Sequence, residues 1–126
     1  MNTLEKLEWI TIIGATVLLF GLGALALPVL DALDNPDYYG DPDYIVKVES
    51  GQWYWKFIYP DGTESGELKI KQGDIVRLEL ESEDVIHSFY VREMGFKVDI
   101  IPGKTRIQVI SGETPGEYWI QCAEFC

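Results

Sequence analysis

An uncharged apolar run near the start of the chain, residues 9–30 (WITIIGATVLLFGLGALALPVL), constrains its structure most. At about 1.5 Å of rise per residue, a helix of this length spans the ~30 Å hydrocarbon core of a bilayer. We therefore predict one transmembrane helix. A cleaved signal peptide is the alternative, because Ala24 and Ala26 resemble a small-residue cleavage site. The one base ahead of the run, Lys6, lies among acids, which disfavours that alternative.

Charge narrows the partners and the topology of the chain. The formal net charge of −11 excludes nucleic acid as a partner, because phosphate binding requires clustered Lys and Arg. Residues 31–43 (DALDNPDYYGDPD) hold five aspartates and no base, which favours the external side of the membrane for this stretch. We divide the chain into a membrane anchor (residues 1–33), an acidic linker (34–43) and a folded domain (44–126).

The folded domain has the period-two alternation of β-strands. In residues 74–81 (DIVRLELE), for example, Val76, Leu78 and Leu80 alternate with charged residues, as in a strand with one buried face. Turn signals such as Pro60-Asp61-Gly62 separate the segments. A β-sandwich or barrel is therefore expected. The predicted strands are residues 44–50, 52–59, 67–71, 74–81, 85–91, 96–101, 105–110 and 117–121.

The only two cysteines, Cys122 and Cys126, lie four residues apart, and the only histidine is His87. In an external domain two cysteines form a disulfide in the simplest interpretation, although a loop this short constrains the unfolded chain little. Alternatively, two thiolates and an imidazole suit copper or zinc. A lone histidine among apolar neighbours is also compatible with a plain core position. Spacing alone leaves these alternatives open.

Three segments, taken in order, resemble subunit II of haem-copper cytochrome oxidases. They are GQWYWKFIYP (residues 51–60), DVIHSFYVREMGFKVDIIPGKT (84–105) and GEYWIQCAEFC (116–126), and they follow a membrane anchor as in that family. One helix instead of two resembles the short form of the subunit. The resemblance implies a mainly β, cupredoxin-like Greek-key β-sandwich or barrel, preceded by one N-terminal transmembrane helix.

The resemblance also implies a dinuclear copper centre, CuA. The thiolates of Cys122 and Cys126 would bridge the coppers, with His87 and the carbonyl oxygen of Glu124 as further ligands. The carboxylate of Glu124 would reach a magnesium site shared with subunit I. Trp53 matches the exposed tryptophan through which electrons enter.

The implied function is that of a respiratory terminal-oxidase subunit in the cell membrane, with its soluble domain on the external or periplasmic side. The domain would take single electrons from cytochrome c or a small copper protein and pass them to the haem-bearing subunit I. Oxygen reduction would belong to that partner, so this chain alone is not catalytic. Acids that suit a basic donor are Glu81, Glu83, Asp84 and Glu93.

One departure from the family pattern concerns the second cysteine. In the family, a histidine, a methionine and a final strand follow that cysteine, whereas the sequence here stops at Cys126. We expect the sequence to be part of a longer chain that supplies those ligands. The main alternative function is that of a quinol-oxidase-type subunit II without functional CuA, which serves a structural role. A membrane-anchored copper carrier and the CuA module of a nitrogen-oxide reductase are further alternatives.

Overall fold

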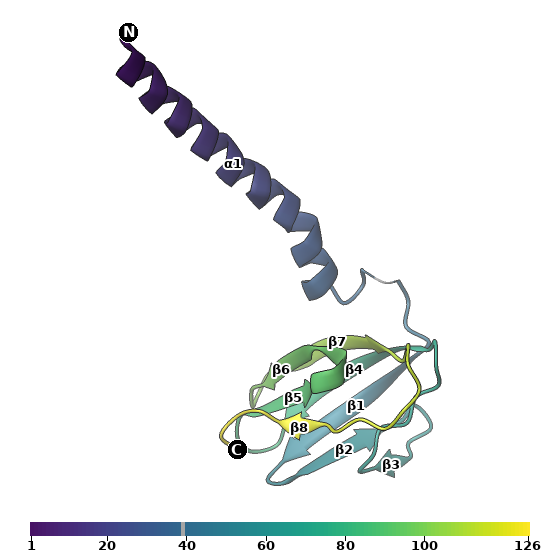
Figure 1. Ribbon diagram of the computed structural model, residues 1–126. Coiled ribbons are helices and arrows are strands. Elements are labelled where there is room, and N and C mark those ends of the chain that lie inside the picture. Colours follow the sequence, from purple (N-terminus) through teal and green to yellow (C-terminus); the bar gives the residue numbers. More distant parts are fainter. Residues whose placement is uncertain (39) are drawn as a thin grey trace. The chain divides into compact units, whose positions relative to one another are not determined.

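The computed structural model describes residues 1–38 and 40–126. Tyr39 falls in the predicted acidic linker and lies outside the described residues. The chain divides into two compact units, of which the first covers residues 1–38 and the second extends to Cys126. Figure 1 shows a single long helix in the first unit and a layered β structure in the second.

The first unit is the helix α1, Thr3–Asp34. It begins with a capping box, in which the Asn2 side chain accepts from the Glu5 backbone N–H and the Glu5 carboxylate accepts from that of Asn2. The hydroxyls of Thr11 and Thr16 donate to carbonyls one turn earlier, so these polar groups have partners within the helix. Among the described residues, α1 is the one helix long and apolar enough to cross a bilayer. The predicted single apolar N-terminal helix is confirmed.

The second unit is a sandwich of two sheets (Figure 1). One sheet has five strands in the order β3-β2-β1-β4-β7, and the other has three in the order β6-β5-β8. β1 and β4 pair in parallel, and the other neighbours pair antiparallel. The strands are β1 (Tyr44–Gly51), β2 (Tyr54–Ile58), β3 (Glu64–Ser65), β4 (Ile75–Ser82), β5 (His87–Val91), β6 (Phe96–Ile100), β7 (Arg106–Ser111) and β8 (Gln121–Cys122), with a 3-10 turn at Arg92–Met94.

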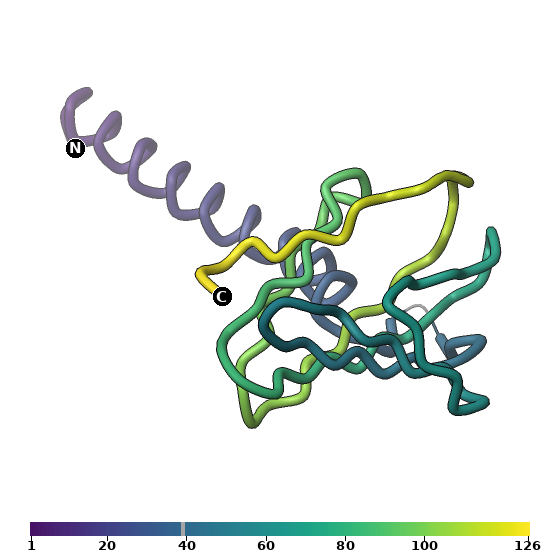
Figure 2. Tube along the Cα trace, turned by 90° about the horizontal axis from the view of Figure 1, so that it is seen from below, coloured from purple at the N-terminus to yellow at the C-terminus, as the bar shows by residue number. Residues whose placement is uncertain are grey.

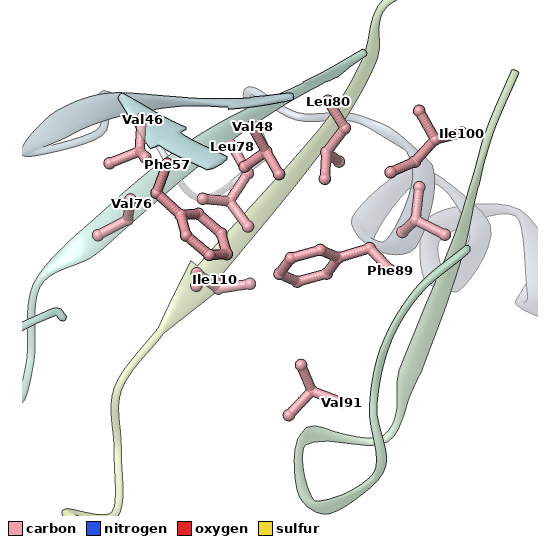
Figure 3. Close-up of a cluster of buried hydrophobic side chains, with 11 residues drawn as sticks. Val46, Val48, Phe57, Val76, Leu78, Leu80, Phe89, Val91, Ile100 and Ile110 are labelled. Carbon is pink, nitrogen blue, oxygen red and sulfur yellow. The ribbon is translucent and has the colours of Figure 1, made fainter. Parts of the chain in front are cut away.

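Apolar side chains from both sheets fill the space between them (Figure 3). Phe57 of β2 and Phe89 of β5 are fully buried and meet edge to face, with their ring centroids 6.4 Å apart. Phe89 also stacks on Phe96 at 5.9 Å. This core fixes the position of β5 against the larger sheet. The buried apolar residues are Val46, Val48, Phe57, Val76, Leu78, Leu80, Phe89, Val91, Val98, Ile100 and Ile110.

Two predicted strands differ from the structure by more than their end residues. Residues 67–71 form no strand among the described residues, because the Tyr59 hydroxyl donates to the Glu67 carbonyl and accepts from the Lys69 N–H. A tyrosine side chain thus takes the place of a neighbouring strand. The prediction for residues 117–121 was also wrong in extent, since pairing is confined to Gln121 and Cys122. The Ile120 carbonyl instead accepts from the Trp55 indole.

Candidate metal centre

The pairing of β5 with β8 brings the histidine and the first cysteine together. Phe89 of β5 is the register partner of Cys122, which places the beginning of β5 beside that thiol. The backbone N–H of Ser88 donates to Cys122 Sγ over 3.4 Å. His87 is the first residue of β5 and precedes Ser88, whereas Phe89 follows it. The two segments are 35 residues apart in sequence and become neighbours through this register.

Three candidate ligand atoms converge at this point. His87 Nδ1 lies 3.8 Å from Cys122 Sγ. The candidate ligand atoms of His87, Cys122 and Cys126 all lie within 4.8 Å of one another. Both cysteines are free thiols in the structure, and His87 is buried with 2% of its surface exposed. The structure therefore brings together three of the predicted site residues and holds the two thiols unbridged.

A carboxylate fixes the orientation of the imidazole. His87 Nε2 lies 2.7 Å from Asp84 Oδ1. Since a carboxylate only accepts hydrogen bonds, Nε2 carries a proton, and in the neutral imidazole the lone pair of Nδ1 faces Cys122. The hydrogen bond with His87 is the main reason that the pKa of Asp84 falls to about 2. Burial tends to lower the pKa of His87, but its bonds with Asp84 and Cys122 outweigh burial and raise it.

Glu124 presents its backbone and its side chain to different partners. Its carbonyl oxygen lies 3.9 Å from Cys122 Sγ and accepts from the Cys126 N–H at 2.9 Å. Its carboxylate is 2.6 Å from Lys97 Nζ, which also lies 3.3 Å from Asp99 on β6. The predicted carbonyl ligand is thus beside the thiols. The assignment of the carboxylate to magnesium stays a prediction, and here Lys97 neutralises that carboxylate.

Trp53 lies in the turn between β1 and β2, and 82% of its surface is exposed. Its indole Nε1 donates to the Cys126 carbonyl over 3.1 Å, and the Gln52 side-chain amide donates to the same oxygen at 2.9 Å. Figure 2 shows the yellow end of the chain close to this turn. The predicted point where electrons enter is therefore both exposed and in direct contact with a candidate ligand residue.

Sequence reasoning missed the partners of the site residues. The sequence alone does not indicate a role for Lys97, and it places Gln52 only at the start of a predicted aromatic strand. Asp84 was grouped with surface acids, whereas its carboxylate contacts His87. The available signal was its spacing, because an acid three residues before a candidate ligand is close enough to orient it.

The donor set fits copper. Thiolates are soft ligands that suit copper(I), and imidazole suits copper and zinc. The bond from Asp84 to the far nitrogen of His87 is the arrangement in which a metal-ligating histidine is usually held. His87 Nδ1, the two Sγ atoms and the Glu124 carbonyl oxygen are the atoms of the described residues that would hold the metal. Zinc is compatible with the same donors by chemistry alone.

The two thiols differ in acidity. Burial tends to raise the pKa of Cys122, but hydrogen bonds from Cys126, from the Ser88 N–H and from other neighbours lower it to about 7. The same bond between the thiols raises the pKa of Cys126 above its ordinary value. Above about pH 7, Cys122 is therefore the thiolate and Cys126 remains the thiol.

This difference predicts selective alkylation of the metal-free protein. At pH 7.5, iodoacetamide should modify Cys122 well before Cys126, since the thiolate is the reactive form. The rate at Cys122 should fall as the pH drops through about 7. Fragment-ion mass spectrometry is required, because both cysteines lie in the tryptic peptide after Arg106. In urea the preference should disappear, and equal labelling of the folded protein would contradict the assigned acidities.

The comparisons with known proteins agree with this geometry. Residues 65–126 match the family model "Cytochrome C oxidase subunit II, periplasmic domain". The crystal structure of the periplasmic domain of subunit II (CoxB) of Bradyrhizobium japonicum is similar to this chain, with 27% identity and a TM-score of 0.63, over 68% of this chain and 75% of that one. Subunit II in a mixed disulfide intermediate with a thioredoxin-like protein, TlpA, is also similar, with 28% identity and a TM-score of 0.60, over 68% and 73% of the two chains.

A third match covers the anchor as well. A chain of a haem-copper terminal oxidase dimer, solved by cryo-electron microscopy, shares the fold with a TM-score of 0.62 over 92% of this chain and 89% of that one, at 24% identity. The predicted mainly β, cupredoxin-like fold behind one apolar helix is thereby confirmed. The family model, the fold and the convergence of His87 with two cysteines agree, and together they support the similarity of this chain to subunit II of cytochrome c oxidases.

Proposed function

We propose that this chain accepts single electrons from a soluble donor at a CuA-type copper centre and passes them to the haem-bearing subunit of a terminal oxidase. The observation that carries the proposal is the convergence of His87 Nδ1, Cys122 Sγ and Cys126 Sγ within 4.8 Å. When bound, copper would supply one-electron redox chemistry, which no side chain of this site provides alone. A dinuclear centre would require further ligands besides these atoms.

The scaffold suits electron transfer because it holds the ligands rigidly. His87 is buried and belongs to the central strand of the smaller sheet, and Cys122 belongs to the strand that pairs with it. Backbone hydrogen bonds and the shared core oppose movement of either side chain. Ligands that move little between redox states lower the reorganisation that accompanies each electron transfer. This rigidity supports a role in transferring electrons.

The surroundings of Trp53 suit a basic donor protein, either a cytochrome c or a small copper protein. Glu81 and Glu83 are exposed at the end of β4, and each carboxylate has a neutral partner, the Thr105 hydroxyl for Glu81 and the Tyr54 hydroxyl for Glu83. Both carboxylates are exposed, and Lys56 lies near enough to Glu83 to interact with its charge. An acidic surface beside an exposed aromatic accelerates the approach of a basic partner.

We place the β unit on the external or periplasmic side of the cell membrane, with α1 as a single-pass anchor beside the haem-bearing subunit. The apolar surface of α1, on which no residue is buried, supports contact with lipid or with another membrane subunit. Magnesium binding by Glu124 would require its carboxylate to leave Lys97, so we assign that role only to the assembled complex.

The thiols must be reduced before copper can bind. A relative forms a mixed disulfide with a thioredoxin-like protein. We propose that a protein of this class keeps Cys122 and Cys126 as free thiols until the metal is loaded. Both cysteines are free and only half-buried, so their thiols are partly open to a partner.

Replacing Trp53 with phenylalanine tests the route by which electrons enter. In the assembled oxidase, Trp53→Phe should slow reduction of the copper centre by the donor at least about tenfold, because the indole contact with the Cys126 carbonyl is lost. Copper content should not change. Stopped-flow absorbance measures the rate, and Trp119→Phe is the matched control, since Trp119 is also 80% exposed. Equal rates for both variants would contradict the proposed role of Trp53.

A further inference from the structure

The carboxylate of Asp84 joins two separate segments of the site. Its Oδ1 atom accepts from the Val85 N–H at 2.6 Å and is 2.7 Å from His87 Nε2. Its Oδ2 atom accepts from the Gln52 N–H at 2.7 Å. Asp84 therefore bonds its own loop, the candidate ligand on β5 and the turn that carries Trp53.

We propose that Asp84 is a positioning residue that couples the orientation of His87 to that of the Gln52–Trp53 turn. The proposal deepens the proposed function, since it assumes that His87 is a copper ligand. Oriented by Asp84 at Nε2, the buried imidazole presents Nδ1 to Cys122. Loss of that contact would allow the other ring orientation or tautomer, with a protonated nitrogen toward the thiol.

The Gln52–Trp53 turn, which Asp84 holds, also contacts Cys126. The Gln52 backbone N–H is fixed by Asp84, and the Gln52 side chain and the Trp53 indole both donate to the Cys126 carbonyl. A closed set of contacts thus runs from His87 through Asp84 and Gln52 to Cys126. The thiol of Cys126 lies near His87 again. The turn that meets the donor is consequently tied to both sides of the copper site.

Only a carboxylate of this length meets all three donors. It offers two oxygens and no N–H, so each of the three hydrogen bonds finds an acceptor. Asparagine has one oxygen, and its NH₂ group would face a donor at either the Gln52 or the His87 side. Glutamate keeps the charge but adds a methylene that displaces the oxygens. These two variants therefore separate geometry from charge.

The alternative role of Asp84 is that of a docking acid for a basic donor. Its side chain is 34% exposed, so its charge reaches solvent. A docking acid would act through charge alone, and Asp84→Glu would keep that function. A positioning residue would be impaired by Asp84→Glu and by Asp84→Asn alike.

The experiment compares Asp84→Asn and Asp84→Glu in the full subunit with Asp61→Asn as the matched control. Asp61 lies in the turn after β2 and accepts from the Thr63 N–H, so asparagine keeps that bond and removes one charge. ¹⁵N NMR of the copper-free subunit reports the His87 tautomer. Titration with copper, the midpoint potential and the electron paramagnetic resonance spectrum report the loaded site. The salt dependence of reduction by the donor reports docking.

We expect both Asp84 variants to shift the His87 ring ¹⁵N signals away from the Nε2-protonated pattern and to weaken copper binding about 10- to 100-fold. Asp61→Asn should leave both properties unchanged. An Asp84→Glu subunit with wild-type ring signals, copper affinity and potential would overturn the proposal. So would Asp84→Asn if it changed only the salt dependence of the donor reaction.

The copper function and the positioning role of Asp84 can be disproved separately. Should the wild-type subunit in its complex take up no copper, the proposed function would be wrong, while the ring ¹⁵N signals would still decide the role of Asp84. Should Asp84→Asn fail to fold, Asp84→Glu alone decides the role of Asp84, since glutamate preserves the charge. Should copper bind normally in every variant, the proposed function stands and the coupling through Asp84 is wrong.

Discussion

Replacing Cys122 with serine should abolish copper binding and the thiolate-to-copper absorption of the subunit in its assembled complex. A serine hydroxyl stays protonated near neutral pH and is a hard donor, whereas copper(I) prefers a soft thiolate. The structure strengthens this expectation, because the Ser88 N–H and other neighbours lower the pKa of Cys122 to about 7. Metal analysis, visible absorbance and electron paramagnetic resonance measure the loss.

The matched control for this substitution is Ala123→Ser. It introduces the same hydroxyl one position along the loop, at an exposed residue. It should retain copper and the spectrum of the wild type. Retention of copper with an unchanged spectrum in Cys122→Ser would contradict the assignment of this thiol as a ligand. A wild-type complex without copper would favour the alternative of a subunit that keeps the fold in a structural role.

The sequence pattern predicted the fold well where burial and backbone pairing coincide. Along β4, Val76, Leu78 and Leu80 are buried as the alternation predicted, and the structure pairs their backbone with β1 and β7. In residues 67–71, Leu68 and Ile70 also pack against the core, but the backbone bonds to the Tyr59 side chain. Alternation reports which side chains face the core, and it cannot report what pairs with the backbone.

The same distinction applies to the candidate site. Ligand chemistry named His87 and the two cysteines, but nothing in their spacing fixed the register that sets Phe89 opposite Cys122. Convergence became visible only in three dimensions. Asp84 illustrates another limitation, since its spacing from His87 allows the contact, but only the structure shows that its carboxylate orients the imidazole.

Phe89→Ala should destabilise the β unit by about 3–5 kcal/mol, the usual cost of removing a buried phenylalanine. Phe89 is 1% exposed and meets the rings of Trp55, Phe57 and Phe96, so the truncation removes contacts to both sheets. Since whole domains are stable by only about 5–15 kcal/mol, this loss is a large share of the total. Urea unfolding of the full chain in detergent, followed by tryptophan fluorescence, measures it.

Phe125→Ala is the matched control, because it makes the same chemical change at a residue that is fully exposed, at 105%. Its free energy of unfolding should stay within about 0.5 kcal/mol of the wild type. The two variants should also differ at the metal site. Phe89 is the register partner of Cys122, so a loosened β5 separates His87 from the thiol, and copper should bind more weakly to Phe89→Ala. Similar free energies of unfolding for the two variants would contradict the importance of Phe89 to the core. Normal copper binding by a destabilised Phe89→Ala variant would show that the site does not depend on the β5–β8 register.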